Sequence, residues 1–266
     1  MAYIEYDGQE FYYNEYGSGE ICLLFIHGLG GNHTLWKHQI DYFRNRYKVI
    51  SVDLFGHGGS SKAFASKSAL ELNTGALNHL ISQNIKTPVI VMGHSLAGSV
   101  LLELYKLHPQ KLKGLVFVDS TYLGLKNIIN MHNDFSRRLL EWPNDRLKEK
   151  VGNFYHNLIG ENTSDENKSL ILTAMTQCNP RWLFEYAVSC GEFYLKNPPE
   201  KLSINSNLPV LVVEAGHGVS SNFSKSWINL FRTADYYLFE NSYHYFFIDK
   251  FVRFNKLLDD FIGGML

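Results

Sequence analysis

The sequence predicts an α/β fold, with a mostly parallel sheet flanked by helices on both faces and a helical cap inserted between two strands. Three observations carry this prediction. Apolar runs of strand length alternate with segments of helical periodicity along most of the chain. This alternation is typical of a parallel sheet, whose neighbouring strands are joined by helical crossovers. The strand pattern also stops after residue 120 and returns only near residue 209.

The first part of the chain alternates in the manner of a hairpin. Residues 3–6 and 9–16 are separated by Asp7-Gly8, a pair typical of a tight turn. The continuous apolar run 21–26 then predicts a strand that is buried on both faces. Further strands are expected at 47–52, 88–92, 114–119, 209–214 and 235–239, and further helices at 34–46, at 69–84, from the turn after 92 to about 108, and at 249–261.

Helical patterns fill the interval between residues 120 and 199. They are expected at 123–141, 145–158, 165–177 and 180–195. We therefore expect a core formed by residues 1–120 and 200–266 and a helical cap insertion at 121–199. The alternative is that these helices pack elsewhere on the sheet.

Composition excludes several classes of protein. The 266 residues are 45% hydrophobic and 19% charged, which is typical of a globular protein with a substantial core. A net charge of −1, without a long basic run, argues against a nucleic-acid partner. The apolar runs are too short to span a bilayer, and the first residues lack the features of a signal peptide. The three cysteines are widely spaced, and we expect them to be reduced. We therefore expect a cytoplasmic protein with no membrane partner. The sequence does not predict the oligomeric state.

A serine occupies the turn between a predicted strand and a predicted helix. Residues 93–98 read Gly-His-Ser-Leu-Ala-Gly and follow the apolar run 88–92. A serine hydroxyl is a weak nucleophile at neutral pH, so it must be exposed and placed beside a base. The strand-to-helix turn exposes Ser95 above the sheet and directs the positive end of a helix at developing negative charge. Ala97 stands where the usual motif has its second glycine.

Three further motifs follow predicted strands. Residues 27–31 read His-Gly-Leu-Gly-Gly, residues 53–61 read Asp-Leu-Phe-Gly-His-Gly-Gly-Ser-Ser, and residues 242–244 read Ser-Tyr-His. With the serine turn, these motifs make the chain resemble the α/β-hydrolase family over almost its whole length outside the cap. The resemblance implies a serine hydrolase fold with a nucleophile elbow, an oxyanion loop and a histidine after the last strand.

The chemistry of acyl transfer assigns roles to these positions. Ser95 is the expected nucleophile, and His244 is the expected base, since it lies in the loop between the last strand and the last helix. The tetrahedral intermediate needs preorganised N–H donors for its oxyanion. The backbone N–H of Leu96, directly after the nucleophile, is one expected donor, and the resemblance implies that of Leu29 as the other. We expect His27 to hold the oxyanion loop and Asp53 to tie its own loop together.

The third catalytic residue is where this chain departs from the family pattern. Relatives usually carry an aspartate a few residues beyond the 209–214 strand, whereas the loop at 215–222 has no carboxylate. We expect Asp119, at the end of an earlier strand, to take this role, because some relatives keep their acid there. Glu214 is the alternative acid, and a histidine held by backbone groups or Asn222 is a third arrangement.

The expected substrate is a small-to-medium apolar carboxylic ester. The cap is rich in aromatic and aliphatic residues, and ligand pockets are mainly apolar. Candidate pocket residues are His27, Trp36, Leu123 and Trp142. No cofactor is implied, and the spacing of His and Cys predicts no metal site. Two alternatives stay open: a carbon–carbon bond hydrolase or lyase on the same scaffold, and a non-catalytic ligand-binding protein.

Overall fold

The computed structural model describes most of the chain. The described residues are 1–63, 67–108, 110–120, 126–156, 158–198, 204, 207–217, 227–231 and 233–265. All statements on structure below concern these residues.

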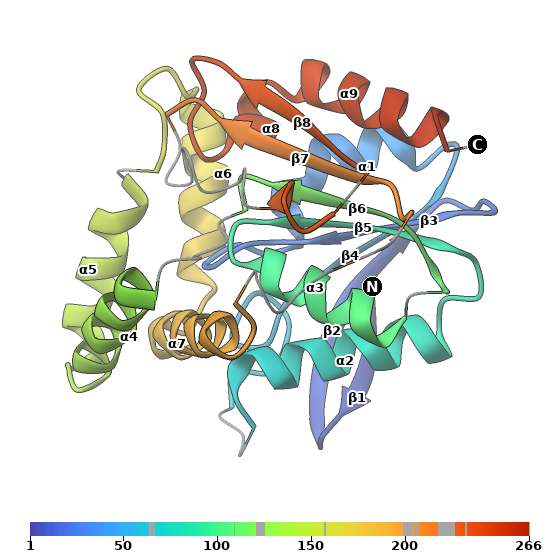
Figure 1. Ribbon diagram of the computed structural model, residues 1–266. Helices are drawn as coiled ribbons and strands as arrows, with labels where there is room; N and C mark the ends of the chain where they lie inside the picture. Colours follow the sequence, from blue (N-terminus) through green and yellow to red (C-terminus); the bar gives the residue numbers. More distant parts are fainter. Residues whose placement is uncertain are drawn as a thin grey trace.

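The described strands form one eight-stranded sheet in the order β1-β2-β4-β3-β5-β6-β7-β8 (Figure 1). The strands are β1 Ala2–Tyr6, β2 Gln9–Tyr16, β3 Cys22–Ile26, β4 Lys48–Val52, β5 Val89–His94, β6 Leu112–Val118, β7 Val210–Ala215 and β8 Ala234–Phe239. β2 pairs antiparallel with both β1 and β4, and every other neighbouring pair is parallel. The predicted mostly parallel α/β fold is therefore confirmed.

Helices cover both faces of the sheet (Figure 1). α1 (Lys37–Phe43) and α9 (Phe251–Gly263) lie on one face, while α2 (Ala69–Gln83) and α3 (Ala97–Leu107) lie on the other. The strand residues divide between two apolar clusters accordingly: Leu24 packs with α2 and α3, whereas its neighbour Phe25 packs with α1 and α9. Side chains of a strand alternate between faces, so a strand with helices on both sides must be apolar throughout.

In the described part of the chain, four helices lie between β6 and β7, where the sequence predicts the insertion. They are α4 Lys126–Leu140, α5 Asn144–His156, α6 Asp165–Thr176 and α7 Pro180–Lys196. Figure 1 shows them beyond the carboxyl ends of the parallel strands, with α4 packed beside α7. None of the helices in the described part of the chain has the length and hydropathy to cross a membrane.

The start of α7 is fixed to the loop that follows β4. The N–H of Asn179 donates to the carbonyl of Gly56 (2.9 Å), and the indole N–H of Trp182 donates to the carbonyl of Lys62 (3.0 Å). A side chain at Gly56 would overlap the Trp182 ring, and the φ of +83° at this position also favours glycine. The insertion is thus joined to the sheet layer by specific contacts at this end.

Candidate active site

Ser95 lies at a strained turn between β5 and α3. Its φ of +57° is in the left-handed region, which non-glycine residues rarely occupy. The turn is held by a hydrogen bond from the Ser95 N–H to the carbonyl of Val118 on β6 (2.9 Å). Gly93 has no room for a side chain, because a Cβ there would lie 2.4 Å from Leu101 Cδ1. Leu96 is the N-cap residue of α3, so its N–H belongs to the positive end of that helix.

His244 and Asp119 meet at the carboxyl ends of the strands. His244 lies between β8 and α8 (Phe246–Asp249), and its Nδ1 is 2.5 Å from Oδ2 of Asp119. Both side chains are buried. Because a carboxylate only accepts hydrogen bonds, this contact places the proton of a neutral His244 on Nδ1 and leaves Nε2 free of a proton. That tautomer is the one a general base needs.

The carboxylate of Asp119 has a second fixed contact. Its Oδ1 accepts a hydrogen bond from the N–H of Ala215 at the end of β7 (2.9 Å). Asp119 also has a left-handed backbone, with a φ of +40°. β7 therefore orients one oxygen of the carboxylate, while the other faces His244.

Glu214, the alternative acid, contacts Tyr236 on β8. Its Oε2 accepts a hydrogen bond from the Tyr236 hydroxyl (2.5 Å), and the carboxylate is buried. Burial and this neighbouring carboxylate raise the pKa of Tyr236, which keeps the hydroxyl protonated as a donor. The structure brings Asp119, rather than Glu214, to Nδ1 of His244.

His94 lies directly beneath the histidine loop. Its ring centroid is 4.3 Å from that of His244, and its Nε2 donates to the carbonyl of His244 (3.1 Å). Burial, together with the nearby His244, holds the pKa of His94 well below its usual value. A buried, neutral His94 positions the loop through its hydrogen bond to the carbonyl of His244.

The loop after β3 approaches Ser95 through its backbone. A Cβ placed on Gly28 would lie 2.7 Å from Cβ of Ser95, so only glycine permits this approach. Two histidines fix the loop. His27 donates from Nδ1 to the carbonyl of Gly28 (2.7 Å) and accepts from the N–H of Leu54 (2.9 Å). His57 accepts from the N–H of Gly30 (3.1 Å).

Burial keeps both histidines uncharged. It lowers the pKa of His27 to about 4 and that of His57 to about 3. At neutral pH each ring therefore has one nitrogen that accepts, as its hydrogen bond from the backbone requires. Leu29, an expected oxyanion donor, is carried on the loop that they hold.

Two of the predicted pocket residues lie in the protein interior. The His27 side chain is fully buried and engaged on both nitrogens by backbone groups. Trp36 is also fully buried, with its ring centroid 5.0 Å from that of Phe25 and 4.6 Å from that of Phe247. The pocket prediction is thus wrong for these two side chains, because packing against the sheet leaves them no surface for a substrate.

The other predicted positions are less constrained. Trp142, after α4, is partly buried, and the Arg146 guanidinium lies 3.8 Å from its ring centroid. Leu123 and Asn222 lie outside the described residues. Asp53 accepts from the N–H groups of His33 (2.6 Å) and Gly59 (2.7 Å), which gives it the expected role of tying its loop together.

No group of three or more His, Cys, Asp or Glu side chains suited to a metal ion occurs among the described residues.

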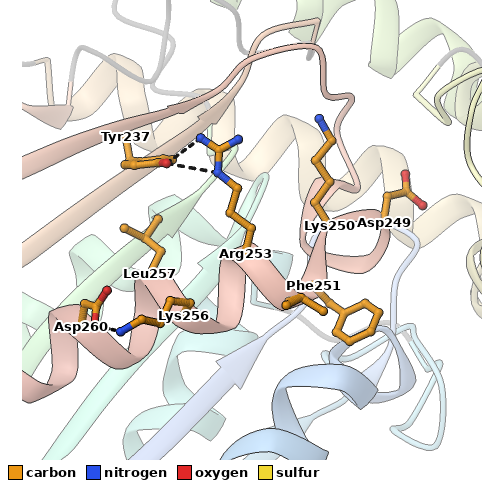
Figure 2. Close-up of a pocket in the computed structure, with 9 residues that line it drawn as sticks. Tyr237, Asp249, Lys250, Phe251, Arg253, Lys256, Leu257 and Asp260 are labelled. Atoms are coloured by element: carbon orange, nitrogen blue, oxygen red, sulfur yellow. Dashed lines mark hydrogen bonds and ion pairs between the residues drawn. The ribbon is translucent and has the colours of Figure 1, made fainter.

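A surface groove of about 570 Å³ lies between β8 and α9, and Figure 2 shows Arg253 in it, donating to the Tyr237 hydroxyl. None of the residues that line this groove is Ser95, His244 or Asp119.

Residues 21–251 match the family model for the alpha/beta hydrolase fold. The chain belongs to this family. The match extends from β3 through α8, and so includes the serine turn, the insertion and the histidine loop. Family membership establishes the hydrolase scaffold and the predicted resemblance.

Curated proteins similar to this chain carry the names of diverse activities. The chain is 30% identical over 122 residues to the dihydrolipoyllysine-residue acetyltransferase component of the acetoin cleaving system of Cupriavidus necator, a match that covers 46% of this chain and 32% of that protein. It is 32% identical over 111 residues to pimeloyl-[acyl-carrier protein] methyl ester esterase of Wigglesworthia glossinidia brevipalpis, covering 42% of this chain and 40% of the esterase. The chain thus spans less than half the length of these relatives.

Solved structures resemble the chain over nearly its full length. An N-acyl homoserine lactone degrading enzyme, Est816, has a TM-score of 0.81 at 21% identity and covers 98% of this chain and 100% of its own. A thermophilic esterase from Thermogutta terrifontis has a TM-score of 0.80 at 16% identity and covers 100% of this chain and 99% of its own. At these identities the likeness shows the fold.

Proposed function

We propose that this protein is a serine hydrolase that cleaves a small-to-medium apolar carboxylic ester through an acyl-enzyme. The observation that carries the proposal is the contact between Nδ1 of His244 and the buried carboxylate of Asp119, beside a strained serine turn. A ligand-binding protein without catalysis has no need for a buried carboxylate that selects a histidine tautomer.

The proposed reaction assigns each group one task. Nε2 of His244 takes the proton from Oγ of Ser95 as the oxygen attacks the ester carbonyl. The C–O bond to the alcohol then breaks, and the same proton passes to the leaving alcohol. Water, activated by His244, releases the acid and restores Ser95. Asp119 stabilises the imidazolium formed in both halves.

The backbone supplies the proposed oxyanion hole. Leu96 contributes its N–H from the start of α3, and Leu29 contributes its N–H from the loop that lies against Ser95. Preorganised donors of this kind stabilise the transition state because they need no reorganisation when charge develops. The insertion α4–α7 is the proposed cap, since it lies beyond the strand ends that carry these groups.

The test combines labelling with turnover. A fluorophosphonate probe is expected to label the protein at neutral pH and to leave Ser95→Ala unlabelled. A panel of p-nitrophenyl esters from acetate to octanoate should then give turnover that depends on acyl length. Absence of labelling of the wild type would contradict the proposal. Labelling without ester turnover would favour the carbon–carbon hydrolase or lyase reading.

A further inference from the structure

Ser120, the residue after Asp119, contacts the backbone of the proposed nucleophile. Its hydroxyl donates to the carbonyl oxygen of Ser95 at 2.6 Å, and its side chain is fully buried. The same carbonyl accepts from the N–H of Gly98 at 3.2 Å. Ser120 therefore fixes a peptide group at the one residue of this turn with a left-handed backbone.

Ser120 is itself held in place. Its carbonyl accepts a hydrogen bond from the indole N–H of Trp227 at 2.7 Å. The Trp227 ring is fully buried and stacks on Phe117 of β6, with 4.2 Å between centroids. A hydroxyl anchored through its own backbone loses little conformational entropy when it binds the turn.

The glycine at position 98 permits this contact. A Cβ on Gly98 would lie 2.0 Å from Oγ of Ser120 and 2.8 Å from Cζ2 of Trp227. Any side chain there would displace the hydroxyl from the Ser95 carbonyl. The second glycine of the motif is thus needed one residue later than its usual place, while Ala97 is tolerated.

Three consecutive residues connect the proposed nucleophile to the proposed base. The carbonyl of Val118 accepts from the N–H of Ser95, the carboxylate of Asp119 accepts from His244, and the hydroxyl of Ser120 donates to the carbonyl of Ser95. Val118 and the two residues after it therefore hold the two peptide groups that flank Ser95, one through its N–H and the other through its C=O, and the same segment orients His244.

We propose that Ser120 is a positioning residue, which sets the height and direction of Ser95 relative to His244. This inference rests on the proposed function. A strained backbone persists only where its surroundings determine it. Without the hydroxyl, the Ser95 peptide relaxes and Oγ shifts from the line between His244 and the substrate carbonyl. A displacement of about 1 Å is enough to lower turnover by about 10²-fold.

The test compares Ser120→Ala with Ser189→Ala. Ser189 is a matched control on α7, because its buried hydroxyl also donates to a backbone carbonyl, that of Tyr186 (2.9 Å). Both variants are measured for melting temperature, rate of fluorophosphonate labelling, and kcat and KM on one p-nitrophenyl ester. We expect Ser120→Ala to lower kcat and the labelling rate about ten- to a hundredfold with KM nearly unchanged. Ser189→Ala is expected to lower only the melting temperature.

The pH profile separates positioning from a general loss of structure. In Ser120→Ala the acid limb of kcat/KM should keep its apparent pKa, because the pair of His244 and Asp119 is intact. If Ser120→Ala does not fold, Trp227→Phe serves in its place: it keeps the ring and removes the N–H that holds Ser120, and we expect the same loss in kcat to a smaller extent.

The outcomes distinguish this inference from the function on which it rests. A wild type that no probe labels overturns both. A labelled wild type with a folded Ser120→Ala variant of equal kcat and labelling rate overturns the role of Ser120 alone. An equal loss of kcat in Ser189→Ala also overturns it, since the effect is then one of stability.

Discussion

Nδ1 of His244 and Oδ2 of Asp119 are 2.5 Å apart, although 125 positions separate them in the chain. The carboxylate that makes this contact comes from the end of β6, and its other oxygen is fixed by the N–H of Ala215 on β7. Two neighbouring strands thus cooperate to present one acid to one histidine. Glu214 lies beside this arrangement and contacts Tyr236 instead.

The first prediction separates the two carboxylates. Asp119→Asn should lower kcat by about 10⁴-fold, because the amide no longer stabilises the imidazolium and permits the wrong tautomer. Glu214→Gln should stay close to the wild type, since its amide oxygen still accepts from Tyr236. Steady-state kinetics on a p-nitrophenyl ester measure both. A large loss in Glu214→Gln with a normal Asp119→Asn would make Glu214 the acid.

The second prediction concerns the approach of the loop after β3 to Ser95. In Gly28→Ala the new methyl would lie 2.7 Å from Cβ of Ser95 and 2.9 Å from Nδ1 of His94, so the loop must move away. Loss of one oxyanion donor costs about 10²- to 10³-fold in kcat, and we expect a loss of that order. Gly152→Ala on α5 is the control, because its Cβ meets no atom within 4 Å. Equal kcat in the two variants would contradict the proposed oxyanion hole.

The third prediction is a dependence of stability on pH. Burial lowers the pKa of His27 to about 4 and that of His57 to about 3, from 6.5 in the unfolded chain. At pH values between the folded-state pKa and 6.5, the unfolded chain binds more protons than the folded one. The free energy of unfolding therefore falls as the pH falls. The free energy of unfolding is unaffected by these two histidines above pH 6.5, and below it falls by up to about 1.4 kcal/mol per pH unit for each histidine until the pH reaches the folded-state pKa of about 4 or about 3.

Urea unfolding at pH 7, 6, 5 and 4.5 measures this slope. The control is His57→Gln, which keeps an acceptor near the N–H of Gly30 but does not titrate in this range. Its free energy of unfolding should change less steeply with pH than that of the wild type. Parallel curves for the two proteins would show that His57 is not neutral in the folded state.

Local patterns in the sequence predict most of the fold. The run 21–26 is apolar at every position because helices cover both faces of β3. An unbroken apolar run of this length can be recognised in the sequence alone, so this strand is predictable without knowledge of the tertiary structure. The helical ranges of the insertion follow from the 3.6-residue period and from Pro143 and Pro180. The observed bounds of α4 to α7 agree with the predicted ranges within a few residues.

The contacts of the candidate site depend on tertiary structure. The left-handed backbone of Asp119 turns its carboxylate toward His244. This conformation cannot be predicted from the type of residue at position 119. No sequence motif identifies the role of the Ser120 hydroxyl either. The only indication in the sequence is that Ser120 directly follows Asp119. From the sequence, Trp36 near the oxyanion loop could line a substrate pocket or pack in the hydrophobic core. Its packing against Phe247, which only the structure shows, places it in the core.

The last prediction concerns Asp53. Like Asp119 it directly follows a strand, but its carboxylate accepts hydrogen bonds from backbone groups of nearby loops. The carboxylate accepts from the N–H groups of His33 and Gly59, and a Cβ on Gly58 would lie 2.1 Å from its Oδ2. Burial raises the pKa of this carboxyl, but the hydrogen bond from the His33 ring and the proximity of His27 outweigh burial and hold the pKa below its usual value. Asp53 is therefore ionised and engaged at neutral pH.

Asp53→Ala leaves buried N–H donors without an acceptor, at about 1–3 kcal/mol each. We expect the midpoint of urea unfolding to fall clearly, while kcat per molecule labelled by the fluorophosphonate probe stays near that of the wild type. Asp41→Ala is the control, because Asp41 pairs with Lys37 on an exposed part of α1 and such pairs contribute about 0–1 kcal/mol. A loss of kcat per labelled molecule, without a loss of stability, would instead place Asp53 in the reaction and reopen the choice of acid.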